Sequence, residues 1–325
     1  RRRHTRSFHV TGVQTCALPI SSFFVGSGDL ANAFYTLGVP DELARMFTLP
    51  AVKAEKLGIT TIDGCAVRPG DLVTPYLTVL PMGWAWALHL CQCVLMKAIH
   101  DAGFLEGQII SDKGQPVCID SHNGIGCAGY VDNFLVIGCN QSCVNAGLQR
   151  IAGKLRGRGL TVHEEEFATP YTDFVGLRFD GKSGTISIKP EMIVKLQRAI
   201  QELVSRNFAS GEVLQLVLGH ITWAVMARRE GLSILRSCYA FANENLHTPK
   251  KLWPSVKWEL QTIAAILPLF RAHVNVGWSE DVAASDSSPF GYGICCRKLD
   301  PKTAGSIGAQ SERWRYRFED AADAR

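Results

Sequence analysis

Two adjacent polar residues inside an apolar run are the first candidates for chemistry in this sequence. In GYVDNFLVIG, residues 129–138, Asp132 and Asn133 interrupt an otherwise apolar stretch. The pattern predicts two short strands joined by a two-residue turn at Asp132 and Asn133, because Asp and Asn both tolerate positive φ. Such a turn can be a simple hairpin connection. It can also lift the Asp132 carboxylate to the edge of a sheet, where it could hold a metal ion.

A second candidate carboxylate, Asp29, ends an apolar segment and opens the sequence DLANAFY. Asp29 at a strand end could bind a metal ion, while Phe34 could pack beneath a nucleotide sugar and exclude a 2′-hydroxyl. The same two residues also suit a structural role, in which Asp29 caps the following helix and Phe34 lies in the core. Both interpretations stay open on this segment alone.

A third segment, LPMGWAWALHLCQ at residues 80–92, places a Pro-x-Gly turn before a helix. A glycine at position 83 allows the backbone to approach a planar ligand or a template strand closely. The alternative is an ordinary strand-to-helix turn followed by core tryptophans.

The elements that must position these residues alternate between strands and helices up to residue 189. Apolar and alternating runs predict strands at 23–30, 58–67 and 72–80, and a hairpin at 174–189 that turns at Asp180–Gly181. Helical spacing predicts helices at 40–47, 84–102 and 143–159. We therefore expect an α+β body over residues 21–189, with an antiparallel sheet and packed helices.

The pattern changes at Pro190. Four successive segments carry helical periodicity, at residues 190–206, 211–228, 232–246 and 254–270. After Trp278 an alternating, glycine-rich pattern predicts strands again. We expect a helical region over residues 190–277 and the beginning of a third domain over residues 278–325.

The composition excludes several classes of protein. Hydrophobic residues make up 46% and charged residues 20% of the 325 residues, which is typical of a globular chain and not of a disordered or coiled-coil one. The net charge of +4 permits nucleic-acid binding without requiring it. Eleven cysteines without a repeating spacing favour reduced thiols and an intracellular location. No apolar stretch predicts a membrane span.

A cluster of thiols and imidazole allows one rival interpretation, a zinc module. The cluster consists of Cys118, His122, Cys127, Cys139 and Cys143. HNGIGC matches half of a zinc-knuckle spacing, but the preceding C-x-x-C pair is absent. Buried, unligated cysteines explain the same residues.

The first twenty residues are unlike the remainder. VTGVQTCALPI, residues 10–20, is the codon-for-codon translation of a short-read sequencing adapter, preceded by a basic stretch. We interpret residues 1–20 as an artefact and exclude them from the fold prediction; a natural basic leader is the alternative.

Taken in order, the candidate segments resemble the palm of reverse transcriptases. The matching segments are Asp29–Phe34 (motif A), Leu80–Gly83 (motif B), Tyr130–Asn133 (motif C) and the following hairpin at Phe174–Gly176. The helical region is similar to the thumb and connection of retroelement polymerases. The segment Asp286–Ile294, which ends in PFGYGI, is similar to the first hairpin of a ribonuclease H domain. This order is typical of LTR-type and related retroelements.

The resemblance implies a fragment of an RNA-directed DNA polymerase that transfers a nucleotide from dNTP to a primer 3′-hydroxyl. It implies that Asp29 and Asp132 bind Mg²⁺, or Mn²⁺, and that Asn133 completes the catalytic turn. Asp286 would be a lone metal ligand of the ribonuclease H domain. The positions implied to contact the nucleotide are Phe34, Met82, Gly83 and Tyr130. The implied partners are an RNA or DNA template with its primer and dNTP, without a membrane; the oligomeric state is left open.

Three departures from the family pattern leave a second interpretation open. Asn133 stands where the family usually has another Asp, and Met82 stands where it often has Gln. Residues 160–167 lack the lysine that many relatives carry there, so we name no general acid. The alternative is a catalytically decayed remnant that binds nucleic acid. We also expect this chain alone not to extend a primer, because residues 21–28 alone precede Asp29 and the fingers are largely missing.

Basic residues on two predicted helices could follow a nucleic-acid backbone through salt-sensitive phosphate contacts. These are Arg150 and Lys154 on one helix and Lys195 and Arg198 on the first helix of the helical region. Solvated helix faces are the alternative for each residue.

Overall fold

A four-stranded antiparallel sheet, here called the central sheet, carries both candidate carboxylates. The computed structural model describes residues 22–111, 117, 119, 124–274, 276–288 and 291–308. The strand order of the central sheet is β6-β7-β1-β8. Its strands are β1 (Phe24–Leu30), β6 (Ile125–Tyr130), β7 (Asn133–Gly138) and β8 (Val162–Thr169). The segment interpreted as an artefact, residues 1–20, lies outside the described residues.

The central sheet is covered on both faces, which explains why the sequence of β7 after Asn133 is apolar without interruption. Phe134 and Val136 point into a core shared with two helices, α4 (Ala87–Asp101) and α5 (Gln141–Arg156). Leu135 and Ile137 point into a second core, which is shared with the helical region. Successive side chains of a strand alternate between faces, so a strand buried on both sides requires apolar residues at each position.

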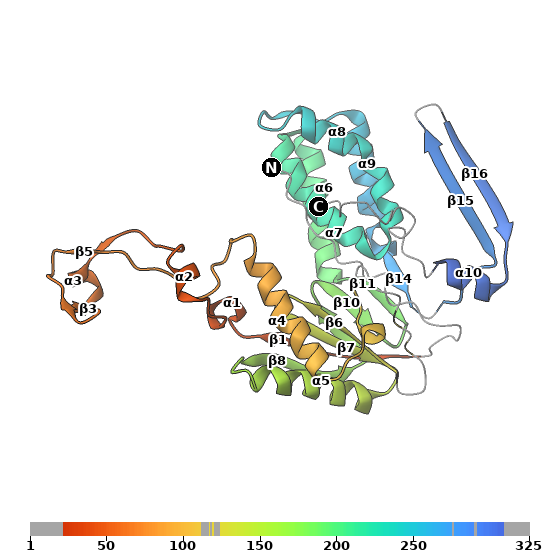
Figure 1. Ribbon diagram of the computed structural model, residues 1–325. Coiled ribbons are helices and arrows are strands. Elements are labelled where there is room, and N and C mark those ends of the chain that lie inside the picture. The colour runs from red at the N-terminus through yellow and green to blue at the C-terminus, as the bar shows by residue number, and fades with distance from the viewer. Residues whose placement is uncertain are drawn as a thin grey trace.

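The two helices on one face begin and end within three residues of the predicted bounds, 84–102 and 143–159. Asn140 caps α5, since its Oδ1 accepts hydrogen bonds from the Ser142 amide at 2.9 Å and the Cys143 amide at 3.3 Å. Helix α4 is followed by Gly103 at φ +86°, a common way for a helix to end. Figure 1 shows α4 and α5 packed against the central sheet on the side away from the helical region.

A second antiparallel sheet joins the body to the helical region. Its order is β14-β11-β10-β9. The strands are β9 (Tyr171–Phe174), β10 (Leu177–Asp180), β11 (Thr185–Ile188) and β14 (Arg271–His273). Strand β11 precedes the helices and β14 follows them, and the two strands pair directly. The chain therefore leaves and re-enters the same sheet, which fixes the base of the helical region.

Four helices form the helical region, and each predicted segment contains one. They are α6 (Pro190–Arg206), α7 (Gly211–Ala224), α8 (Arg236–Glu244) and α9 (Pro254–Ile266). Pro190 and Pro254 occupy first helical positions, where proline costs no hydrogen bond. Short 3₁₀ turns η3 (Val225–Ala227), η4 (Arg229–Ile234) and η5 (Leu267–Leu269) connect or end the helices. A two-residue pairing of β12 (Phe208–Ala209) with β13 (Lys250–Lys251) ties their far ends.

Residues 33–86 form an arm that extends from the end of β1 (Figure 1). It contains only short elements: α1 (Ala33–Thr36), α2 (Asp41–Ala44), β2 (Val52–Lys53), α3 (Ala54–Leu57), β3 (Thr61–Ile62), β4 (Cys65–Ala66) and β5 (Leu72–Val73). The predicted strands at 58–67 and 72–80 were therefore wrong in extent. Asp63 and Gly64 both have positive φ, 50° and 78°, so the first segment turns back on itself as a tight hairpin.

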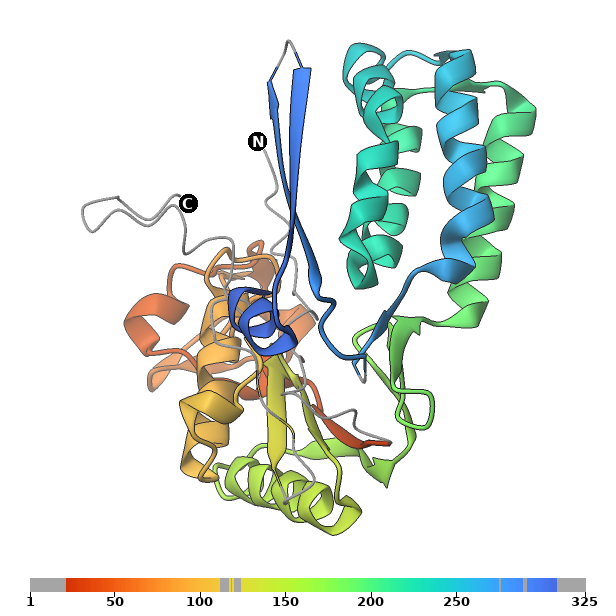
Figure 2. The same cartoon turned by 90° about the vertical axis from the view of Figure 1, so that its right-hand side faces the viewer.

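The described C-terminal part consists of a separate hairpin followed by a helix. Strands β15 (Asp281–Ser288) and β16 (Gly291–Lys298) pair with one another in a two-stranded sheet that projects beside the helical region (Figure 2). The strands were predicted, but α10 (Pro301–Gly308) was not. Among the described residues, no helix combines the length and apolarity that crossing a membrane requires.

Candidate functional site

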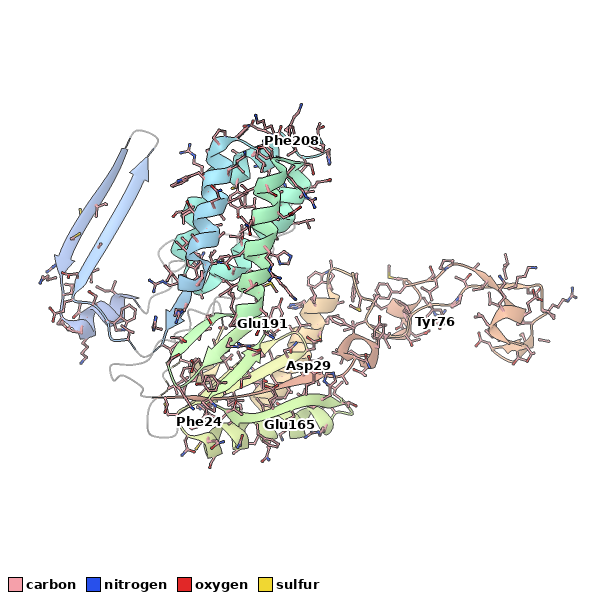
Figure 3. The ribbon with its side chains drawn as sticks, turned by 180° about the vertical axis from the view of Figure 1, so that it is seen from behind. Phe24, Asp29, Tyr76, Glu165, Glu191 and Phe208 are labelled. Carbon is pink, nitrogen blue, oxygen red and sulfur yellow. The ribbon has the colours of Figure 1, made fainter. Side chains whose placement is uncertain are left out.

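The pairing of β1 with β7 brings the two candidate carboxylates to the same edge of the central sheet. Asp29 lies opposite Asn133 in the antiparallel register. The amide of Leu30 donates a hydrogen bond of 3.0 Å to the carbonyl oxygen of Asp132. Burial and the negative charge of Asp132 both raise the pKa of Asp29 above its ordinary value. Figure 3 shows Asp29 near the point where the arm leaves the sheet.

The turn that carries Asp132 differs by one residue from the predicted turn. Tyr130 pairs with Asn133, so the turn residues are Val131 and Asp132, and Asn133 already belongs to β7. Val131 has a φ of 59°, which is unusual for a β-branched residue and stores backbone strain. Asp132, the second turn residue, does not have a positive φ, which fits a type II′ hairpin and excludes type I′, where both turn residues have positive φ. The prediction had assigned positive φ to the polar residues.

Asn133 holds the neighbouring carboxylate. Its Nδ2 donates a hydrogen bond of 2.9 Å to Oδ1 of Asp132. An Asp at position 133 could not donate this bond in its charged form, since a carboxylate only accepts. The amide therefore orients Asp132 and lowers the negative charge of the site by one.

Strand β8 adds two residues that the sequence reasoning missed. His163 lies opposite Asp29, with its Nε2 4.0 Å from Oδ1 of the carboxylate. The nearby charge of His163 lowers the pKa of Asp29, and that of Glu164 raises it, in addition to the larger effects of burial and Asp132. Glu164 has a φ of 50° on a strand whose register is irregular. In the sequence these residues are part of HEEE, residues 163–166, and only the pairing of β8 with β1 shows that they lie beside Asp29.

The donor set fits a divalent cation that is completed by a substrate. The negative charge of Asp132 acts on Asp29, and a cation bound by both carboxylates would relieve the repulsion that raises the pKa of Asp29. Within the described residues, no group of three or more His, Cys, Asp or Glu side chains is arranged to enclose a metal ion. Polymerase-type sites bind Mg²⁺ through one or two carboxylates together with substrate phosphates, so two carboxylates suffice for such a site.

The predicted nucleotide-contacting residues come from three elements. Phe34 lies in α1 and packs partly buried against the core beneath α4. Gly83 has a φ of 97°, and a Cβ there would meet no atom within 4 Å. Met82 is 65% exposed, and its sulfur accepts a hydrogen bond of 3.4 Å from the hydroxyl of Tyr35. Tyr130 ends β6 and packs partly buried against the second core.

The predicted basic residues lie on two different sides of the central sheet. Arg150 and Lys154 are exposed on α5, where the Arg150 guanidinium lies 5.1 Å from the ring centroid of Phe104. Lys195 and Arg198 are exposed on α6, in the helical region. The roles of all four in nucleic-acid binding stay predictions.

The remaining predicted metal positions lie elsewhere. Asp286 belongs to β15, opposite Gly293, in a different sheet from Asp29; its side chain is outside the described part. Of the zinc-module candidates, Cys127 is fully buried in β6, and burial raises the pKa of its thiol. Cys139 and Cys143 are partly buried. The other two, Cys118 and His122, lie outside the described residues.

Comparison with known proteins identifies the fold. No family model matches the sequence, and no curated protein matches it. The structure is similar to foamy viral protease–reverse transcriptase in complex with an RNA/DNA hybrid, with a TM-score of 0.52 at 14% identity, over 90% of this chain and 36% of that chain. It is also similar to the dRH form in complex with double-stranded DNA, with a TM-score of 0.52 at 14% identity, over 91% and 44% of the two chains.

A third foamy viral protease–reverse transcriptase structure, in complex with double-stranded DNA, has a TM-score of 0.50 at 14% identity, over 92% of this chain and 52% of that chain. This chain thus spans between about a third and about half of the length of these structures. At this identity the likeness establishes a reverse-transcriptase-like α+β fold.

Proposed function

We propose that this chain is part of an RNA-directed DNA polymerase from a retroelement, which transfers nucleotides from dNTP to a primer 3′-hydroxyl. In this assignment residues 21–189 are the palm, 190–277 the thumb and connection, and 278–325 the beginning of a ribonuclease H-like domain with Asp286 as one metal ligand. The observation that carries the proposal is the meeting of Asp29 and Asp132 at adjacent strand ends within a reverse-transcriptase-like fold.

Asp29 and Asp132 are the residues that would hold the divalent cations, Mg²⁺ or Mn²⁺. When bound, such ions lower the pKa of the primer hydroxyl and neutralise charge that develops on the triphosphate. The chain's own contribution is to fix two carboxylates at the edge of a buried sheet. Asn133 orients Asp132 through its 2.9 Å hydrogen bond and leaves the site with one negative charge fewer than the family pattern.

The other assigned residues shape the space around the reacting atoms. Phe34 would lie beneath the sugar of the incoming nucleotide and favour deoxynucleotides, and Gly83, open on its Cβ side, would form the floor below the base. Met82 and Tyr130 would flank that floor and the catalytic turn. Lys195 and Arg198, exposed on α6, would contact phosphates of the template and primer.

The test combines cation binding by this chain with primer extension by the longer polypeptide that contains it. Mn²⁺ binding is measured by electron paramagnetic resonance, and extension is measured on an RNA template with a DNA primer. We expect Asp29→Asn and Asp132→Asn each to abolish extension and to weaken Mn²⁺ binding at least tenfold. The matched control is Asp63→Asn, since Asp63 is exposed in the arm at a positive φ that Asn adopts equally well. Equal Mn²⁺ binding by all four proteins would refute the assignment.

One observation favours a second candidate, a non-catalytic remnant that binds nucleic acid. Glu164 adds a negative charge near Asp29, on the strand where relatives often carry a lysine, and this charge opposes a triphosphate. The remnant predicts that the polypeptide binds an RNA/DNA hybrid in a fluorescence anisotropy titration but incorporates no nucleotide with Mg²⁺ or Mn²⁺. Incorporation with either ion would exclude it.

A further inference from the structure

We infer that Gln92 is a positioning residue that holds the turn bearing Asp132 in its metal-binding orientation. This inference rests on the proposed function, because it assigns Gln92 a role through Asp132 and not a contact with substrate. Gln92 lies on α4, 39 residues before Val131 in sequence, and it ends the segment 80–92, in which only Met82 and Gly83 were predicted to contact the nucleotide.

The amide of Gln92 bonds to the backbone on both sides of Tyr130. Its Oε1 accepts a hydrogen bond of 2.6 Å from the Val131 amide, and its Nε2 donates one of 3.0 Å to the carbonyl oxygen of Gly129. Both bonded peptide groups lie within three residues of Asp132. A side chain that bonds to two backbone groups at once fixes the position and the rotation of the strand end between them.

These two backbone groups need a partner from outside the hairpin. In the described part of the chain, β6 is the edge strand of the central sheet. The segment at Ile109 and Ile110 bonds to its outer edge at Cys127, and Gly129 lies two residues beyond that bridge. The amide of Val131 is a turn group beyond the last paired residue, Tyr130. Val131 also has the strained φ of 59°, which persists only where surrounding contacts hold it. The 2.6 Å hydrogen bond to Gln92 is such a contact.

The preceding residue on α4 holds the same turn. Cys91 is fully buried, and its Sγ lies 3.3 Å from the carbonyl oxygen of Val131 as a hydrogen-bond donor. From the other side, the Leu30 amide donates to the carbonyl oxygen of Asp132. The turn is therefore held between α4 and β1, and Gln92 makes the two N–H···O bonds on the α4 side.

The experiment separates two roles of Gln92: positioning Asp132, and merely supplying hydrogen-bond partners for the backbone groups of Gly129 and Val131. Gln92→Leu removes both hydrogen bonds and replaces the amide with an apolar side chain of similar size. Gln92→Met also removes both hydrogen bonds, and its unbranched side chain serves as a second variant in case leucine packs badly at this position. The matched control is Gln108→Leu, because the Gln108 Oε1 accepts one local hydrogen bond, from the Leu105 amide at 3.0 Å, away from the turn. All variants are made in the 325-residue chain.

The first measurement is Mn²⁺ affinity by electron paramagnetic resonance, and the second is amide hydrogen exchange at Val131 and Asp132. Loss of a residue that orients a metal ligand typically weakens metal binding by about 10–100-fold. We expect a loss of that size in both Gln92 variants, with at least tenfold faster exchange at Val131, and neither change in Gln108→Leu. Thermal unfolding checks that the variants are folded.

Two results overturn the inference. If Mn²⁺ affinity is unchanged within threefold while exchange at Val131 is faster, Gln92 only provides hydrogen-bond partners for the backbone and does not position Asp132. Unchanged exchange means that Gln92 does not hold the turn at all. Failure of the proposed function gives a different result, because the wild-type chain itself then binds no Mn²⁺; in that case exchange at Val131 and Asp132 alone decides whether Gln92 positions the turn.

Discussion

Asp29 lies directly opposite Asn133 across β1 and β7, and this single pairing sets the geometry of the candidate site. Because Asp132 is the residue before Asn133, it reaches the end of β1, where the Leu30 amide bonds to its carbonyl oxygen. A shift of one residue in this register would turn Asp29 to the opposite face of the sheet. The burial of β7 on both faces, through Phe134 and Leu135, makes such a shift costly.

The first prediction is that removing the charge of Asp29 stabilises the metal-free protein. Burial and Asp132 raise the pKa of Asp29 above 3.8, so the folded state binds a proton more tightly than the unfolded state. The free energy of unfolding therefore falls as the pH rises from 3.8, the ordinary pKa of the group, through the higher pKa of Asp29 in the folded state. We expect metal-free Asp29→Asn to be more stable than the metal-free wild type at neutral pH by about 0.5–2 kcal/mol, the usual range for optimising charges. Urea denaturation measures the difference.

The same experiment has an internal check. Below the ordinary pKa of 3.8, Asp29 is protonated in both states, so wild type and variant should converge. Saturating Mn²⁺ should stabilise the wild type more than Asp29→Asn. A variant that is less stable than wild type at neutral pH without metal would contradict this account of the two carboxylates.

The second prediction concerns the residue that departs from the family pattern. Asn133→Asp removes the hydrogen bond to Asp132 and places two carboxylates side by side. We expect the metal-free variant to lose about 1.5–3 kcal/mol of stability, the value of a hydrogen bond to a charged group. We also expect Mn²⁺ to bind about tenfold more tightly, since an added carboxylate favours a hard cation. Denaturation and paramagnetic resonance measure the two effects.

Asn140→Asp is the matched control for Asn133→Asp. Asn140 caps α5, and Asp caps a helix as well as Asn does, so this variant adds the same charge without loss of the cap. If Asn140→Asp tightened Mn²⁺ binding equally, the effect would come from net charge and not from a ligand at the turn.

The third prediction concerns a buried carboxylate in the helical region. Glu259 is 6% exposed and accepts hydrogen bonds from the Ser237 amide at 2.8 Å and the Cys238 amide at 2.9 Å, at the start of α8. Glu259→Leu leaves both donors buried and unpaired, which costs on the order of 2–4 kcal/mol. Urea denaturation should show this loss. Glu202→Gln, in an exposed ion pair with Arg206 on α6, should change stability by less than about 0.5 kcal/mol.

The pH dependence of Glu259 has a defined sign. Burial acts to raise its pKa, but the hydrogen bonds from Ser237 and Cys238 outweigh burial, so the pKa lies below the ordinary 4.5. The ionised group stabilises the fold above pH 4.5, and this stabilisation is lost as pH falls through the lower folded value. Glu259→Gln should flatten the acid limb of the stability curve. An unchanged acid limb would show that Glu259 is not the group responsible.

The sequence predicted what depends on local patterns. Helical spacing with proline at the first position identified α6 and α9, and the apolar run around Asp132 identified the β6–β7 hairpin. The one-residue error in the turn has a physical cause: local propensity assigns positive φ to Asp and Asn, whereas the contacts of α4 place it at Val131.

What the sequence could not predict depends on pairing between distant segments. His163 lies beside Asp29 only because β8 pairs with β1, and Gln92 reaches Val131 only because α4 packs along β6. Neither residue has a distinctive local pattern. The predicted long strands in the arm failed for the opposite reason: Asp63–Gly64 is a local turn signal that the strand assignment overlooked.

The last prediction tests how closely α4 must approach the hairpin. A Cβ on Gly129 would lie 2.9 Å from Cδ1 of Ile99 and 3.1 Å from Cδ2 of Leu95, both on the buried face of α4. Gly129→Ala should therefore push α4 away and cost about 1–3 kcal/mol, as overpacking of a core does. Gly153→Ala on α5, where a Cβ would meet no atom within 4 Å, should instead stabilise by about 0.5–1 kcal/mol. Displacement of α4 also moves Gln92, so Gly129→Ala should speed amide exchange at Val131, and Gly153→Ala should not. If the two variants had equal stability, the space beside Gly129 would be larger than the structure shows; unchanged exchange at Val131 in Gly129→Ala would show that the position of α4 does not control the turn.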